Sequence, residues 1–251
     1  MFANQKQPEP SSDVGAIVAR IVSGDDARRD GEGSGGRSNE LRSLIGALVA
    51  SARAAGKVSL IGGRWLTDLL VDVTPRIPLR DLSTLRAQHP GLSDDDLAQT
   101  LISGAAKATG AVGAAGGALA AVEFAAPPTL LTAPVQLAAE TLLVAAIEIK
   151  LIAELHEVYG AAVAGTTRER AAAYLVAWTN RRGIDPRQPG ALRLALGGPA
   201  KAALRRRVIR RAGRNLSTMG PLMSGAVAGS LINHRETRRV GDQVRADLRG
   251  R

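Results

Sequence analysis

The sequence predicts an all-α protein, a multi-helix bundle built around a central Gly/Ala-rich helical hairpin, with a disordered N-terminal tail. Three observations predict this class. Apolar residues recur with helical spacing along most of the chain, and no segment shows sustained strand alternation. Hydrophobic residues make up 45% of the chain but only 2% is aromatic, so its apolar volume comes mainly from Ala, Leu and Val, together with 28 Gly. Such small side chains favour close helix–helix packing over β-sandwiches or barrels.

Residues 1–38 are predicted to form the disordered tail. Most of this segment is polar and rich in Gly, Pro and Ser, with too few apolar groups to offset the entropy of ordering. Residues 14–22 could form a short helical turn, but Arg20 interrupts it. A secretory signal needs a basic start and an uninterrupted apolar stretch, and neither is present, so we expect a cytoplasmic protein.

Residues 39–92 are predicted to be an N-terminal helical segment. From position 41, apolar residues recur at i, i+3, i+4, i+7 and i+8, which predicts a helix from near Asn39 to near Gly56. A second, shorter apolar face covers 65–73, where two prolines end it. A short helix is expected over 82–88, closed by a His-Pro-Gly sequence.

Residues 93–251 are predicted to form the main helical domain. Ser93 and the three aspartates after it are typical of a helix N-terminus, and we expect this helix to reach about Ala125. Prolines then break the chain, and a second long helix is expected from Pro134 to Tyr159. The remaining expected helices start at a capping box and at two prolines, and cover about 166–181, 199–215 and 221–248.

The central hairpin could lie inside a soluble bundle or dip into a bilayer, and the sequence leaves both interpretations open. Its uncharged stretch of 108–122 would be roughly 22 Å long as a helix. That is short of the ~30 Å hydrocarbon core, and spanning it would bury a charge. Residues 215–234 also lack formal charge and have the length of a span, but their polar side chains and Pro221 favour a core helix.

Small residues four positions apart predict close packing of two helices. One such ridge lies in the first helix of the hairpin, and its natural partner is the helix of 134–159. A second lies in the last helix. The residues of the two ridges are Gly113, Gly117 and Ala121, and Gly225 and Gly229.

The net charge of +10 is concentrated at the end of the chain. Residues 1–180 carry 16 Lys/Arg and 19 Asp/Glu, a net of −3, whereas residues 181–251 carry 17 and 4, a net of +13. Most of this excess falls in the expected helix 199–215, which contains no acidic residue. The cations that we take as candidate membrane- or anion-binding residues are Lys201, Arg205, Arg206, Arg207, Arg210, Arg211 and Arg214.

Three interpretations of this basic helix remain open. It can be a solvated face, it can bind an anionic lipid surface, or it can bind an acidic protein or nucleic acid. A Lys or Arg near an anionic membrane gains about 1 kcal/mol, so seven together matter. Nucleic acid is disfavoured, because no aromatic residue from Gln188 onward could stack on a base.

No catalytic, metal or cofactor site is predicted, and we expect a non-enzymatic protein. The chain has no Cys, its three histidines are isolated, and no phosphate-binding loop or nucleophile elbow is present. Four acidic residues of the second hairpin helix could gather around a cation, but a polar helix face is the favoured interpretation. These residues are Glu140, Glu148, Glu154 and Glu157.

Two stretches resemble the EcsC-like family of bacterial proteins. The run from Pro221 to Asn233, followed by Thr237 and Gly241, is similar to the family's P-x-x-G-A-x-x-G-x-x-x-N stretch and its T-x-x-x-G helix. The Gly-rich helix and the following helix that ends at Gly160 resemble the family's middle. The resemblance covers roughly residues 95–250 and leaves 39–92 outside, as a lineage-specific addition.

This resemblance implies a helical, membrane-associated protein of unassigned biochemical role, with no catalytic residues to carry over. A protein partner is implied only through the family's association with an ABC transporter. We therefore expect a peripheral protein at the inner face of the cell membrane, held by its basic helix. The alternative is a soluble cytoplasmic interaction module whose helix 199–215 binds an acidic protein or nucleic acid.

Overall fold

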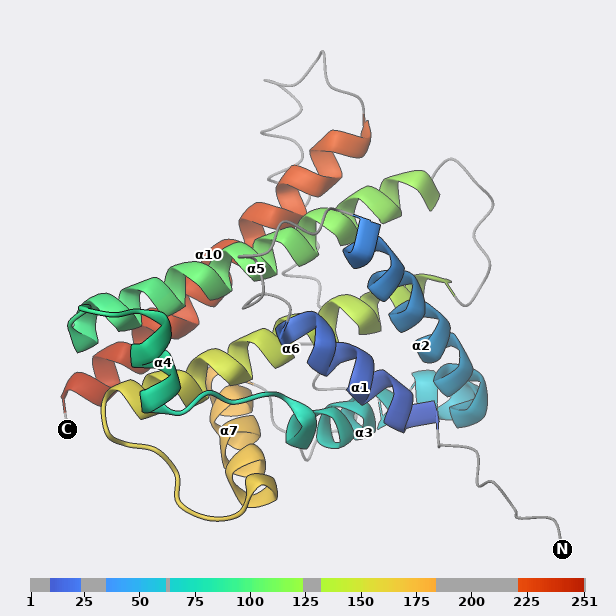
Figure 1. Ribbon diagram of the computed structural model, residues 1–251. Helices are drawn as coiled ribbons and strands as arrows, with labels where there is room; N and C mark the ends of the chain where they lie inside the picture. Colours follow the sequence, from blue (N-terminus) through green and yellow to red (C-terminus); the bar gives the residue numbers. More distant parts are fainter. Residues whose placement is uncertain (1–9, 24–34, 62–63, 124–131, 184–220, 251) are drawn as a thin grey trace, which may run out of the picture.

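The computed structural model describes residues 10–23, 35–61, 64–123, 132–183 and 221–250 (Figure 1). Within these ranges the chain is all-helical and contains no strand, which confirms the predicted fold class. The elements are α1 (Pro10–Ser23), α2 (Gly35–Ile61), α3 (Arg64–Val73), the 3-10 turn η1 (Thr74–Arg76), α4 (Leu82–Gln88), α5 (Asp94–Glu123), α6 (Thr132–Val158), α7 (Thr167–Arg181) and α10 (Pro221–Arg249).

Helix α6 is the centre of the bundle. It contacts α1, α2, α3 and α4 from the N-terminal part of the chain and α5, α7 and α10 from the rest (Figure 1). None of its side chains whose exposure is described is fully exposed to solvent. Buried residues from 39–92 and from 93–251 belong to one hydrophobic cluster, so the two predicted segments share a core.

Helices α5 and α10 lie side by side and run antiparallel (Figure 1). Asp95, at the start of α5, pairs with Arg249, at the end of α10. Further along, Gly113 of α5 meets Gly229 of α10, and a Cβ added at either would overlap backbone atoms of the other. The absence of side chains at this crossing lets the two backbones approach closely.

The partner of the first small-residue ridge differs from the expected one. Helices α5 and α6 do pack together, as a hairpin should, but α5 packs most extensively against α10, and Gly113 faces that helix. The pattern of small residues identifies a face suited to close approach, but several helices in a bundle can supply the other side. The other ridge residues, Gly117, Ala121 and Gly225, lie in helical backbone whose side-chain surroundings are outside the described part.

The prediction of a disordered tail over 1–38 is wrong for residues 10–23 and 35–38, which are helical. In α1, four apolar side chains are buried in the common core: Val14, Ile17, Val18 and Val22. They recur at helical spacing, and the exposed Arg20 lies on the opposite face, so it does not interrupt them. Residues 1–9 and 24–34 lie outside the described part of the chain.

Local helix signals position most of the remaining elements. The Ser93 hydroxyl accepts a hydrogen bond from the Asp96 N–H at 3.2 Å, and Thr166 forms the predicted capping box with Glu169.

Helix α4 has the predicted bounds. Helix α6 ends one residue before the expected Tyr159, and Gly160 follows with φ +65°, a conformation that glycine adopts without strain. The expected basic helix 199–215 lies outside the described residues.

Gly113→Ala should destabilise the protein by about 1–3 kcal/mol, because the new methyl group would push α5 and α10 apart. Gly104→Ala on the same helix is the matched control, since a Cβ there meets nothing within 4 Å. The control should gain about 0.5–1 kcal/mol from helix propensity. Urea unfolding measures both changes, and equal signs for the two variants would contradict the close crossing.

Candidate functional site

Several charged side chains of α6 lie inside the bundle. Glu148 is fully buried, and Lys150 and Glu154 are nearly so. The favoured interpretation of these carboxylates as a polar, solvent-facing helix side is therefore wrong for Glu148 and Glu154. Buried charges need partners, and the two carboxylates meet different ones.

The Glu148 carboxylate accepts hydrogen bonds from two other helices and from the residue just after one of them. The Trp178 indole N–H donates to Oε2 at 2.7 Å, and the Thr237 hydroxyl donates to Oε1 at 2.7 Å. Arg182 donates through Nε to Oε2 at 2.9 Å and through Nη2 to Oε1. Each carboxylate oxygen thus has two donors. This saturated arrangement joins α6, α7 and α10 and leaves the carboxylate no role in binding a ligand.

Asp95 forms a second charged cluster at the end of the α5–α10 pair. Its carboxylate accepts from the Tyr159 hydroxyl at 2.8 Å and from Arg249 Nε at 2.7 Å, and Arg245 lies 3.5 Å away. The hydrogen bond from Arg249, followed by that from Tyr159, lowers the pKa of Asp95 to about 2. Burial raises the pKa of the Tyr159 phenol. The cluster fastens the C-terminal end of α10.

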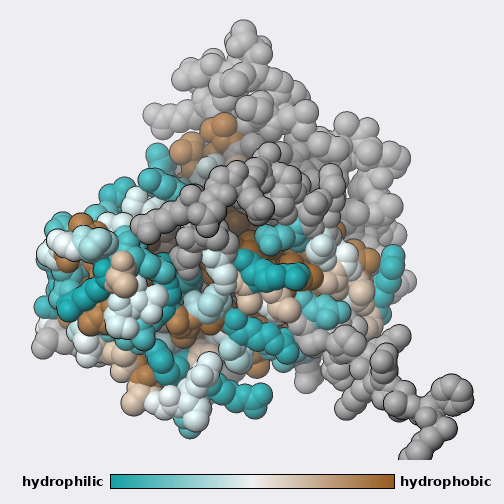
Figure 2. Space-filling view, in the orientation of Figure 1, coloured by the Kyte–Doolittle hydropathy of each residue, from teal (hydrophilic) through white to brown (hydrophobic). Residues whose placement is uncertain are grey.

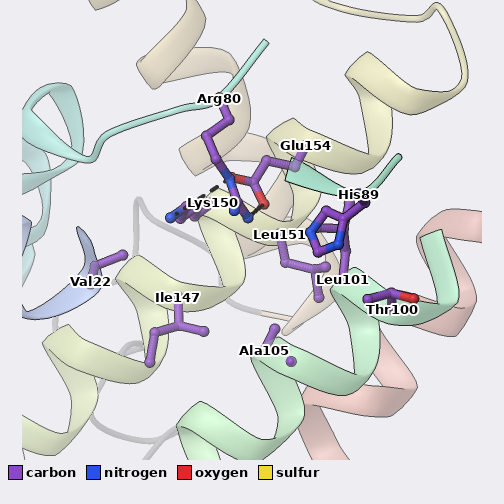
Figure 3. Close-up of a pocket in the computed structure, with 11 residues that line it drawn as sticks. Val22, Arg80, His89, Thr100, Leu101, Ala105, Ile147, Lys150, Leu151 and Glu154 are labelled. Carbon is purple, nitrogen blue, oxygen red and sulfur yellow. Dashed lines mark hydrogen bonds and ion pairs between the residues drawn. The ribbon is translucent and has the colours of Figure 1, made fainter. Parts of the chain in front are cut away.

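A cavity of about 200 Å³ lies between α1, α5, α6 and the segments just before and just after α4 (Figure 3). Charged side chains on one side and apolar side chains on the other give it a mixed lining. The lining residues are Val22, Arg80, His89, Thr100, Leu101, Gly104, Ala105, Ile147, Lys150, Leu151 and Glu154.

The charged side of this cavity is built around Glu154. Arg80, just before α4, donates to both carboxylate oxygens, from Nε at 2.7 Å and from Nη2 at 2.8 Å, and its Nη1 donates to Gln88. Lys150, one helical turn before Glu154, has its Nζ 3.9 Å from Oε1. All three charged side chains are at most 16% exposed, so they interact through protein more than through water.

The outward face of α10 is a surface of a different kind. Val227 and Leu231 are exposed near its N-terminal end, and Arg235, Arg238 and Arg239 are exposed beyond them. At 100° per residue these five positions fall within an arc of roughly 120°, so they form one stripe, which we call the α10 stripe. Figure 2 shows hydrophobic residues at the upper edge of the molecule, where the N-terminal half of α10 emerges.

The seven basic residues predicted to bind a membrane or an anion, from Lys201 to Arg214, lie outside the described residues. Of the packing residues, the structure brings together Gly113 and Gly229. Within the described ranges, no group of His, Cys, Asp and Glu could hold a metal ion. No helix there is long and apolar enough to cross a membrane.

Sequence reasoning missed Arg80, Arg182 and the α10 stripe as features of interest. The arginines gave no signal, because their partners Glu154 and Glu148 are 74 and 34 residues away. The α10 stripe does have a signal, since its five residues follow helical spacing.

Comparison of the chain with protein-family models, with curated proteins and with solved structures finds no match in any of the three. The EcsC-like resemblance therefore stays a prediction made from sequence motifs. Its C-terminal motif, residues 221–241, lies in α10, the helix that carries the stripe.

Glu148→Gln should cost about 3–5 kcal/mol of folding free energy, because the largely buried Arg182 would lose its hydrogen-bonded carboxylate and keep only the 3.8 Å contact with the more exposed Glu236. Asp247→Asn is the control: it removes the same charge from the partner of the neighbouring Arg181, but Asp247 is 61% exposed. That loss should be at most about 1 kcal/mol. Chemical denaturation compares the two, and similar losses would contradict a structural role of the buried carboxylate.

The low pKa of Asp95 predicts a specific loss of stability in acid. A carboxyl whose pKa falls from 3.8 to about 2 on folding stabilises the protein above its unfolded-state pKa, and this contribution disappears as pH falls through its folded-state pKa. Asp95→Asn should therefore flatten the dependence of unfolding free energy on pH between about 4 and 2. Arg249→Gln should raise the pKa of Asp95, as measured by NMR titration. An unchanged pH slope in the asparagine variant would refute this assignment.

Proposed function

We propose that this protein is a non-enzymatic, peripheral membrane protein of the EcsC-like type that binds the anionic inner face of the cell membrane. The observation that carries the proposal is the α10 stripe, in which exposed Val227 and Leu231 adjoin exposed Arg235, Arg238 and Arg239. An interfacial helix combines these two features, since apolar side chains enter the headgroup region while cations meet lipid phosphates.

The charge distribution supports an anionic surface as the partner. The α10 stripe lies in the C-terminal quarter of the chain, whose net charge is +13, while the remainder carries −3. Attraction to a negative membrane would therefore orient the molecule with this quarter toward the lipid. The candidate residues from Lys201 to Arg214 precede α10 in the chain and would add to the same attraction.

The internal pairing of the acidic groups supports a non-enzymatic role. Glu148, Glu154 and Asp95 each accept hydrogen bonds from an arginine. These pairs hold helices together, and we assign none of them to proton transfer or nucleophilic attack. The proposed role is binding, with α6 and α5 holding α10 in place.

Vesicle flotation tests this proposal with the full-length protein. We expect it to float with vesicles containing phosphatidylglycerol and phosphatidylcholine, to float less at high salt, and to stay in solution with phosphatidylcholine alone. Replacing Arg235, Arg238 and Arg239 by glutamine should weaken binding by about a hundredfold, at about 1 kcal/mol for each cation.

The matched control replaces the exposed Arg53, Arg86 and Arg168 of α2, α4 and α7 by glutamine, which gives the same change in net charge. It should bind vesicles like the wild type. Equal losses in the two triple variants would mean that only net charge matters. Absence of flotation would refute membrane binding, and capture by nucleic acid or an acidic protein would then support the soluble interaction module.

The contribution of 199–215 is tested separately. Neutralising Arg205, Arg206, Arg207, Arg210 and Arg211 should also weaken flotation, because these residues carry much of the C-terminal charge. Unchanged binding in that variant would restrict the lipid contact to α10.

A further inference from the structure

The three arginines of the α10 stripe are not neutralised by the rest of the bundle. Arg235, Arg238 and Arg239 are exposed, and within the described part of the chain none of them takes part in an ion pair. The other arginines described between positions 181 and 249 each pair with a carboxylate, and these are Arg181, Arg182, Arg245 and Arg249. The charge of the stripe is therefore available to a partner outside the molecule.

The spacing of the three arginines lets them act on one group. Arg238 and Arg239 follow Arg235 by three and four residues, and side chains at these spacings are neighbours on a helix, with Cβ atoms about 5–6 Å apart. All three border one open hollow on the outward face of α10, together with Asp242, Gln243 and Ala246. A single anionic group in this hollow can thus contact more than one guanidinium.

The charges that border the hollow favour a doubly charged anion. The three arginines and the carboxylate of Asp242 carry a formal charge of +2. A phosphomonoester carries about −1.5 to −2 near neutral pH, because its second pKa is about 6. A phosphodiester, such as the headgroup link of phosphatidylglycerol, carries a single negative charge. The phosphomonoester is therefore the better match to the hollow.

Guanidinium groups also distinguish the two kinds of phosphate by geometry. Each guanidinium is a planar fork that can donate two parallel hydrogen bonds to two phosphate oxygens. A phosphomonoester presents three terminal oxygens, so several forks can bind it at once. A phosphodiester presents only two, and its two ester substituents restrict the directions of approach. Adjacent arginines thus gain more hydrogen bonds from the phosphomonoester.

The apolar end of the α10 stripe favours a lipid over a soluble phosphate ester. Val227 and Leu231 precede Arg235 by eight and four residues, and they are 38% and 44% exposed. A small soluble ester would leave this hydrocarbon in water. When it enters the membrane interface instead, the arginines are carried to the level of the headgroups. Water screens charge less there than in bulk solution, so hydrogen-bonded pairs with phosphate are strengthened.

From these observations we infer that the α10 stripe recognises lipids whose headgroup is a phosphomonoester, with the phosphate bound by Arg235, Arg238 and Arg239. This inference rests on the proposed membrane contact and narrows it to one class of headgroup. Phosphatidate is the simplest lipid of this class and is the probe for the test. Phosphatidylglycerol is its phosphodiester counterpart.

Flotation of the full-length protein with two kinds of vesicle tests the inference. One kind contains phosphatidate and the other phosphatidylglycerol, each mixed with phosphatidylcholine to the same zeta potential, so that the surface charge is equal. We expect binding to the phosphatidate vesicles to be at least about tenfold tighter, because additional charge-assisted hydrogen bonds form only there.

Replacing the three arginines by lysine keeps the charge of the stripe and removes the forks. The triple variant Arg235→Lys, Arg238→Lys and Arg239→Lys should bind phosphatidylglycerol vesicles within about twofold of the wild type and lose most of the preference for phosphatidate. The matched control makes the same change at three exposed arginines of other helices and should keep the preference. These control positions are Arg53, Arg86 and Arg168. Circular dichroism should be unchanged in both variants, since all six side chains are exposed.

The outcomes separate this inference from the proposed function. Absence of flotation with either vesicle would refute the membrane contact and this inference with it. Equal binding to both vesicles would overturn the phosphomonoester inference alone, and so would a preference that persists in the lysine variant of the stripe. Calorimetric binding of glycerol 3-phosphate as tight as the binding of phosphatidate vesicles would assign the arginines to a soluble ester and overturn the assignment to a lipid.

Discussion

The fully buried carboxylate of Glu148 is the constraint around which the C-terminal half of the bundle is arranged. A charge at this depth is tolerable only if its oxygens are fully hydrogen-bonded. The donors come from Trp178 in α7, from Arg182 just after it and from Thr237 in α10. Meeting this requirement fixes the positions of α7 and α10 against α6. Apolar contacts alone would restrict these positions less, since they have little directionality.

Helix α10 depends on these hydrogen bonds because its two sides differ. The inward side packs against α5 and α6, and the outward side is exposed to solvent. Its inward side carries Gly229, Asn233, Thr237 and Gly241 at four-residue spacing, and these small or polar residues suit close contact with α5 and hydrogen bonds to α6. The same side also buries apolar residues, namely Ala228, Ile232, Val240, Val244 and Leu248. Directional polar contacts and apolar burial thus hold the helix in place, and the outward side can carry the exposed α10 stripe without weakening the core.

Helices and caps that depend on neighbouring residues could be predicted from the sequence, whereas contacts between residues far apart in the chain could not. Helix α4 and the Thr166 capping box follow from residues within one or two turns of each other. Helix α1 was missed because Arg20 was counted as an interruption, although a helix places it away from the apolar side. The burial of Glu148 depends on donors 30 to 89 residues away. Likewise, a ridge of small residues does not specify that Gly113 meets Gly229, 116 positions later.

Helix α6 thus carries two buried carboxylates with different consequences. Glu148 and Glu154 are six residues apart, which places them on different sides of the helix, about 120° apart around it and about 9 Å apart along its axis. Around Glu148 the donors come from α7, from the residue that follows it and from α10, and both oxygens are saturated within packed protein. Around Glu154 one donor comes from the short connection before α4, and a cavity adjoins the pair. A bundle stabilised by the first carboxylate can keep imperfect packing at the second, because the stability of the helix arrangement does not depend on filling that cavity.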